Sequence, residues 1–185
     1  VQYNDEERYI PRRVGVMDAL FNNLYVQVIK RSSEAYKFAE QDGNSNLQGV
    51  SLVLQANAYQ ILTDTYGPVP FTEAVNDNIS KPSYDSQEVV YDGILAMLDE
   101  AETHFSNGSG TFTSSADLLY AGNVSKWRKL AASLKFKVLM RISSKRNVNT
   151  QLQALFDYGL LMSSNYDSAQ LAYKGSQPDA NPIYE

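Results

Sequence analysis

The sequence contains no cysteine and a single histidine, His104, among its 185 residues. The absence of cysteine excludes a disulfide framework, a thiolate metal site and a cysteine nucleophile. A single histidine cannot form a metal site with a second one. His104 lies near the end of a predicted helix, where a cation interacts favourably with the negative end of the helix dipole. We therefore expect neither a metal site nor a cofactor, and a fold that packing alone stabilises.

Long apolar runs are also missing. No stretch of about 18 consecutive apolar residues occurs, whereas a membrane-spanning helix needs roughly 20. The first thirteen residues, VQYNDEERYIPRR, have neither the apolar centre nor the cleavage site of a secretory signal. We therefore expect no spanning helix, and we expect any targeting segment to have been removed or to lie upstream of this chain.

Charge is unevenly distributed along the chain, whose net charge is −5. Residues 118–156 contain eight Lys or Arg and no acidic residue. Such a run could bind nucleic acid or an anionic polysaccharide, but helical spacing spreads these side chains over several faces rather than one stripe. We therefore expect no nucleic-acid partner, and we hypothesise that part of the run pairs with acidic side chains of a neighbouring helix, namely Asp92, Asp99, Glu100 and Glu102.

Apolar residues recur at steps of three and four, which is the period of amphipathic helices. This pattern predicts helices near residues 16–41, 47–66, 86–105, 123–145 and 149–158. Helix termination explains the turn that begins at Gly67, since Pro68 and Pro70 cannot continue a helix. Asp85 precedes a capping-box-like sequence, so we expect its side chain to cap the third helix at the amide of Glu88.

The order of these elements predicts an all-α fold. Long helices joined as antiparallel pairs, with no strand-rich stretch between them, indicate an α-α superhelix of tetratricopeptide-like pairs with long loops. No clean 34-residue repeat is visible in the sequence. We expect residues 1–185 to be part of a single helical domain.

Three segments are similar in order and spacing to the SusD/RagB family of nutrient-binding proteins. These segments are QGVSLVLQANAYQILTDTYGPVPFTEA (residues 48–74), KPSYDSQEVVYDGILAMLDEA (residues 81–101) and DLLYAGNVSKWRKLAASLKFKVLMRIS (residues 117–143). The tail from residue 160 also resembles the family, so the similarity covers about residues 20–185. Family members are usually more than twice this length, which implies that the chain is a partial one.

The resemblance implies a non-catalytic lipoprotein on the surface of the outer membrane of a Bacteroidetes-type bacterium. It implies binding of an oligosaccharide or polysaccharide and its delivery to a SusC-like TonB-dependent transporter. It also implies attachment through an upstream lipid anchor that this chain does not contain. Two alternatives stay open on the same scaffold: a peptide ligand, or a structural lid of the transporter without a ligand of its own.

The residues themselves give no sign of an enzyme. Asp99, Glu100 and Glu102 are neighbouring carboxylates, but a helix directs adjacent side chains about 100° apart, so we expect them to diverge. Trp127 lies on an apolar helical stripe, which favours core packing over sugar stacking.

Three other aromatic residues lie in or beside predicted connections, where side chains are less often buried in the core. We therefore name them as candidate ligand-binding residues: Tyr84, Phe112 and Tyr120.

Overall fold

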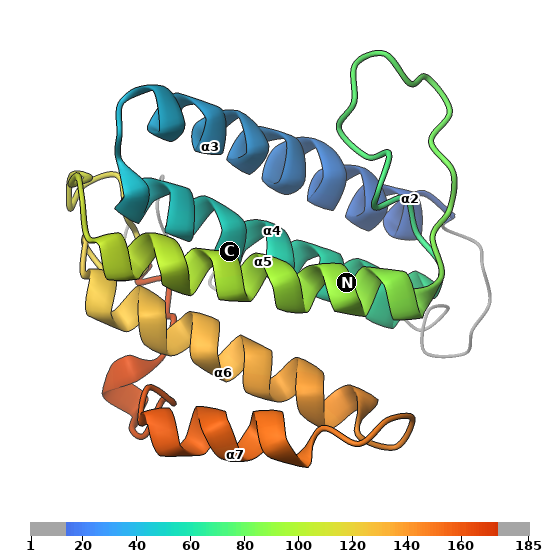
Figure 1. Ribbon diagram of the computed structural model, residues 1–185. Helices are drawn as coiled ribbons and strands as arrows, with labels where there is room; N and C mark the ends of the chain where they lie inside the picture. The colour runs from blue at the N-terminus through green and yellow to red at the C-terminus, as the bar shows by residue number, and fades with distance from the viewer. Residues whose placement is uncertain (1–13, 174–185) are drawn as a thin grey trace.

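A computed structural model describes residues 14–173 of the protein (Figure 1). Its elements are α2 (Val14–Asn22), η1 (Asn23–Lys30), α3 (Arg31–Gln41), α4 (Ser45–Tyr66), α5 (Gln87–Asn107), α6 (Val124–Ile142), α7 (Asn149–Tyr158) and η2 (Asn165–Asp167). Within the described range no strand occurs, and β pairing is confined to an isolated bridge between Val69 and Asp85. The prediction of an all-α fold is confirmed.

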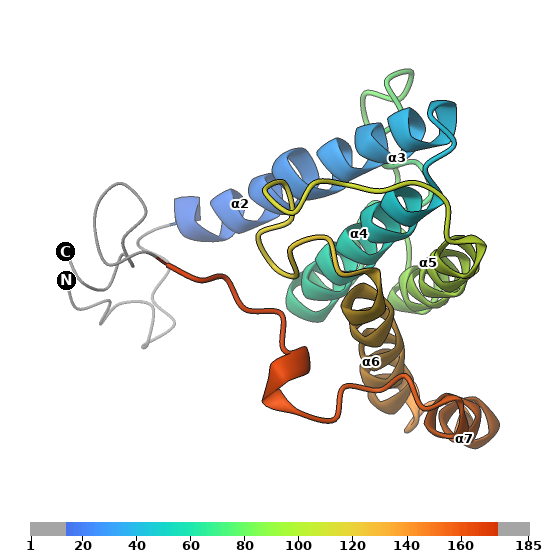
Figure 2. The same cartoon turned by 90° about the vertical axis from the view of Figure 1, so that its left-hand side faces the viewer.

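Successive long helices run antiparallel to one another (Figure 1). The segment from α2 to α3 runs one way, α4 returns beside it, and α5, α6 and α7 alternate in turn. Figure 1 shows α7 at the opposite side of the molecule from α2 and α3, and Figure 2 shows α5 and α7 nearly end-on. This arrangement confirms the predicted α-α superhelix of tetratricopeptide-like pairs.

The predicted helix boundaries hold closely for most elements. The range 149–158 matches α7, and α4 starts two residues before the predicted 47 because Asn44 caps it. The Asn44 side chain accepts a hydrogen bond of 3.0 Å from the amide of Leu47. The predicted first helix, 16–41, is interrupted by the π-helical turns of η1, which hydrophobic periodicity does not reveal.

The core lies around α4, which packs against α3, α5 and α6. Leu62 of α4, Val90 of α5 and Leu139 of α6 are all fully buried. Trp127 is only 3% exposed, so the prediction that it packs in the core is confirmed. Burial of this apolar surface is the main stabilising contribution to such a fold.

The predicted capping role of Asp85 is wrong. Ser86 caps α5 instead, accepting a hydrogen bond of 3.4 Å from the amide of Val89. The Asp85 carboxylate accepts hydrogen bonds from the amides of Phe71 (3.0 Å) and Thr72 (2.8 Å). These bonds from the turn after α4 are contacts over 13 and 14 residues, which a local capping motif in the sequence cannot reveal.

The hypothesis that α6 pairs with acidic residues of α5 is confirmed for part of the basic run. Three ion pairs join the basic run to α5: Arg128–Glu102, Lys135–Asp99 and Arg146–Asp92. Another basic residue of α6, Lys129, pairs instead with Asp167 of η2 at 2.8 Å. Opposite charges on adjacent helices therefore support the antiparallel α5–α6 packing, although exposed pairs contribute only about 0.2–1 kcal/mol each.

Candidate ligand-binding site

The structure does not bring the three predicted ligand-binding residues together. Tyr84, in the connection between α4 and α5, is 65% exposed. Phe112 is half-buried and packs against the core. Tyr120, just before α6, is only 6% exposed.

Tyr120 is buried and engaged in contacts within the protein. Its ring meets that of Trp127 edge to face at 5.4 Å, and its hydroxyl donates a hydrogen bond of 2.9 Å to the carbonyl oxygen of Asp167. Burial, with smaller contributions from Asp167 and Asp117, raises the pKa of Tyr120 to about 12. Ligand stacking on this ring would require these contacts to break, so the position of Tyr120 lends that prediction no support.

Asp117 organises the start of α6 beside Tyr120. Its carboxylate accepts hydrogen bonds from the Trp127 indole (2.8 Å) and from the amides of Leu119, Tyr120 and Gly122. Burial opposes the charged form, but these donors outweigh it and hold the pKa of Asp117 below its usual value. A carboxylate engaged in this way maintains structure and is not free for catalysis.

Tyr84 borders an open hollow, which we call the Tyr84 hollow. It has a volume of about 440 Å³ and is lined by Asp18, Phe21, Asn22, Tyr66, Pro68 and Tyr84. Phe21 and Tyr66 meet edge to face at 5.3 Å, and Asp18 and Asn22 are exposed. An exposed ring beside hydrogen-bonding side chains can bind a ligand that has one apolar face and polar edges.

A second hollow lies between α5, α6 and α7, and we call it the α7 hollow. Its volume is about 330 Å³, and its lining residues are Leu98, Asp99, Glu102, Ala131, Ala132, Lys135, Gln151, Ala154, Leu155 and Tyr158. Alanine and leucine side chains form its apolar surface, whereas Asp99 and Gln151 are exposed polar groups. Small-molecule sites combine these features.

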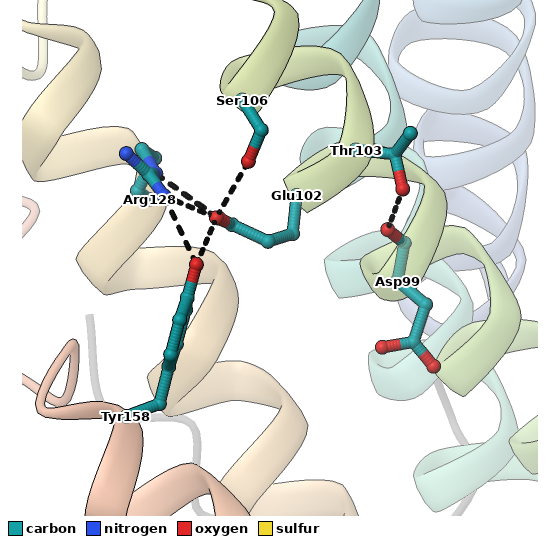
Figure 3. Close-up of polar contacts among 6 residues, drawn as sticks. All are labelled: Asp99, Glu102, Thr103, Ser106, Arg128 and Tyr158. Atoms are coloured by element: carbon teal, nitrogen blue, oxygen red, sulfur yellow. Dashed lines mark hydrogen bonds and ion pairs between the residues drawn. The ribbon is translucent and has the colours of Figure 1, made fainter.

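Glu102 lines the α7 hollow and connects α5 with α6 and α7 through its polar contacts (Figure 3). Its carboxylate pairs with the guanidinium of Arg128 and accepts hydrogen bonds from the hydroxyls of Tyr158 (3.0 Å) and Ser106 (3.2 Å). Arg128 also donates to the Tyr158 hydroxyl at 3.2 Å. The hydrogen bond to Glu102, opposed by burial, raises the pKa of Arg128.

Sequence reasoning missed Tyr158 because its partners are 30 and 56 residues away along the chain. Its position just before Gly159 indicated only the end of a helix. The sequence shows only an aromatic residue at the end of a short helix, whereas the structure shows that none of the residues of α7 is buried. Exposed aromatic side chains on a short helix are candidates for recognition.

The neighbouring carboxylates of α5 diverge as predicted. Asp99 and Glu102 pair with α6, whereas Glu100 accepts a hydrogen bond of 2.8 Å from Tyr36 of α3. His104 lies 3.2 Å from the same Tyr36 hydroxyl. Among residues 14–173, no group of three or more His, Cys, Asp or Glu side chains could hold a metal ion, and no helix is long and apolar enough to span a membrane.

Comparison with solved structures shows the same helical arrangement in several larger proteins. A SusD homologue from Bacteroides uniformis is 27% identical, with a TM-score of 0.79 over 88% of this chain and 34% of that one. A SusD homologue from Bacteroides fragilis is 28% identical, with a TM-score of 0.75 over 83% of this chain and 34% of that one. A chitin-binding protein is 33% identical, with a TM-score of 0.73 over 82% of this chain and 33% of that one.

The chain thus spans about a third of the length of the solved structures that it matches. No curated protein matches the sequence significantly. A SusD-like family described as "Starch-binding associating with outer membrane" matches residues 1–185. The chain therefore belongs to the SusD-like family.

Proposed function

We propose that this chain is the helical part of a non-catalytic glycan-binding protein on the outer-membrane surface. In this role it holds a neutral oligosaccharide or polysaccharide and delivers it to a SusC-like TonB-dependent transporter. An upstream lipid anchor attaches the protein to the membrane. The family's description as starch-binding, the chitin-binding relative and the Bacteroides origin of similar structures support this proposal.

The exposed ring of Tyr84 is the observation that carries the binding function. Tyr84 is 65% exposed, and it lines the Tyr84 hollow together with Asp18 and Asn22. A sugar ring has an apolar face that packs on an aromatic ring and hydroxyl groups that bond to carboxylate and amide groups. The Tyr84 hollow therefore matches the two-sided chemistry of a pyranose.

The engaged acidic residues support a role without catalysis. Glycoside hydrolysis needs two carboxyl groups that flank one bond, one as acid and one as base or nucleophile. In α5, Asp99 and Glu102 are held by α6, and Glu100 is directed toward α3. We therefore expect bound glycans to be released unchanged in length.

Affinity electrophoresis tests this function. The protein is run through gels that contain soluble starch, glycol chitin or other plant, host and bacterial polysaccharides, and the glycan is then checked for unchanged mass. We expect retardation by at least one neutral glycan. Uniform migration in every gel would contradict the proposal and would favour a peptide ligand or a transporter lid without a ligand of its own.

A matched pair of variants tests the role of Tyr84. Tyr84→Ala should weaken glycan binding by roughly fivefold, since a stacked aromatic ring contributes about 1 kcal/mol. Tyr173→Ala removes another exposed tyrosine, 52% exposed, that does not line the Tyr84 hollow. This control should bind like the unmodified protein, and equal loss in both variants would remove Tyr84 from the site.

A further inference from the structure

We propose that the α7 hollow is a second glycan subsite, in which Tyr158 is the stacking platform for one neutral pyranose unit. This inference rests on the proposed glycan-binding function but concerns a different surface. The Tyr84 hollow is lined by residues of α2, α4 and the connection before α5, whereas the α7 hollow is lined by α5, α6 and α7. The two subsites can therefore be tested independently.

The orientation of Tyr158 is fixed before any ligand arrives. Its side chain reaches from α7 to Arg128 on α6 and Glu102 on α5 (Figure 3). Its hydroxyl donates to Glu102 at 3.0 Å and accepts from Arg128 at 3.2 Å. Nevertheless the residue is 55% exposed, so two hydrogen bonds hold a ring that the core does not bury. A fixed ring loses little conformational freedom on binding, which favours affinity.

The charges around the α7 hollow indicate an uncharged ligand. Asp99 is paired with Lys135, and Glu102 is paired with Arg128. Each charged group that lines the hollow therefore already has a partner of opposite sign. An anionic or cationic ligand would have to displace one of these pairs, whereas the hydroxyl groups of a neutral sugar could hydrogen-bond to them without breaking them.

The apolar lining and the size of the α7 hollow fit a single sugar unit. Exposed Ala154 and half-buried Leu155 give an apolar surface beside the Tyr158 ring. Exposed Gln151 supplies an amide that can both donate and accept hydrogen bonds. A volume of about 330 Å³ lies at the small end of ligand pockets, which commonly span roughly 300–1,000 Å³.

Nuclear magnetic resonance titration with maltotetraose and with chitotetraose tests the second subsite. We expect one of these oligosaccharides to shift the methyl signals of Ala131, Ala132 and Ala154. Tyr158→Ala should weaken this interaction about tenfold, and Ala154→Phe should abolish it by filling the hollow. The control is Phe156→Ala, which removes a 69% exposed ring of α7 that does not line the hollow.

The variant Tyr158→Phe tests separately the contribution of the ring and that of the two hydrogen bonds that hold it. The ring remains but both hydroxyl hydrogen bonds are lost, so binding should fall between that of the unmodified protein and that of Tyr158→Ala. An intact α7, seen in unchanged backbone signals of residues 149–155, excludes helix loss as the cause.

The possible outcomes distinguish this inference from the proposed function. Shifts near Tyr84 without shifts of the three alanine methyl groups would overturn the second subsite and leave the glycan-binding function in place. Shifts of the Ala131 and Ala132 methyl groups that persist in both Tyr158→Ala and Ala154→Phe would also overturn it. If neither oligosaccharide shifts any signal, the subsite and the proposed function both fail for these glycans.

Discussion

Helices α4 and α7 use their side chains in opposite ways. Of the 22 residues of α4, 15 are buried, whereas none of the 10 residues of α7 is buried. The apolar residues of α4 therefore pack in the core, whereas Phe156 and Tyr158 of α7 are exposed. We infer that packing around α4 supplies most of the stability. Exposed residues of α7 can therefore serve in recognition without weakening the fold.

Truncation in α4 should have the largest effect. Leu62 is completely buried, so Leu62→Ala removes apolar contacts and leaves a cavity in the core. We expect the free energy of unfolding to fall by about 2–5 kcal/mol, measured by urea denaturation. A loss below about 1 kcal/mol would show that α4 is not the centre of stability.

A close contact between α5 and the turn after α4 should have the next largest effect. A Cβ atom at Gly93 would lie 2.0 Å from Cζ of Phe71, so Gly93→Ala forces the ring to move. We expect a loss of about 1–3 kcal/mol in thermal or urea unfolding. In a helix without this contact, Gly→Ala raises stability by up to about 1 kcal/mol, so any gain would contradict the packing described here.

The Asp117 cluster should make stability depend on pH. Because the folded state lowers the pKa of Asp117, its contribution is complete above the unfolded pKa of about 3.9 and is lost as pH falls through the folded value. Asp117→Asn should cost about 1–2 kcal/mol at pH 7, since Asn offers one acceptor oxygen to the four donors. Urea unfolding at pH 7, 5, 4 and 3 should show this difference shrinking below about pH 4.

If the loss of unfolding free energy in Asp117→Asn stays constant with pH, the charge of Asp117 is ruled out as its cause. Asp157→Asn is a suitable control, because this exposed residue of α7 accepts a hydrogen bond from the side chain of Gln153 alone among the described contacts. It should leave the free energy of unfolding at pH 7 nearly unchanged.

The smallest effect should come from α7. Phe156 is 69% exposed, and Phe156→Ala should change the free energy of unfolding by less than about 0.5 kcal/mol. Comparing the losses of unfolding free energy in Phe156→Ala and Leu62→Ala measures directly how differently α7 and α4 contribute to stability. A loss of more than about 1.5 kcal/mol would show that the outer face of α7 also carries stability.

Periodicity predicted the helices because a repeat of 3.6 residues is a local property of the chain. The range of α7 and the end of α4 at Tyr66 agree with the prediction. The π-helical turns of η1 were not predicted, since one extra residue in a turn scarcely changes the apolar pattern. The pairing of α5 with α6 was also foreseen, because complementary charge on neighbouring helices is visible in the sequence.

The candidate site was harder to predict because it depends on contacts between distant segments. Position in a connection suggested exposure for both Tyr84 and Tyr120, yet Tyr120 is buried by Trp127 and by Asp167, 47 residues away. Conversely, Tyr158 ends a helix and gave no sequence signal of its contact with Arg128. Asp85 shows the same limit, since its carboxylate binds a turn rather than the helix that follows.

The separation of stability from recognition is tested most directly by affinity electrophoresis of the double variant Tyr84→Ala/Tyr158→Ala. We expect this variant to migrate in starch and chitin gels as it does in a gel without glycan, while its unfolding midpoint in urea stays close to that of the unmodified protein. Undiminished retardation of a folded double variant would contradict the placement of glycan recognition on these two exposed rings.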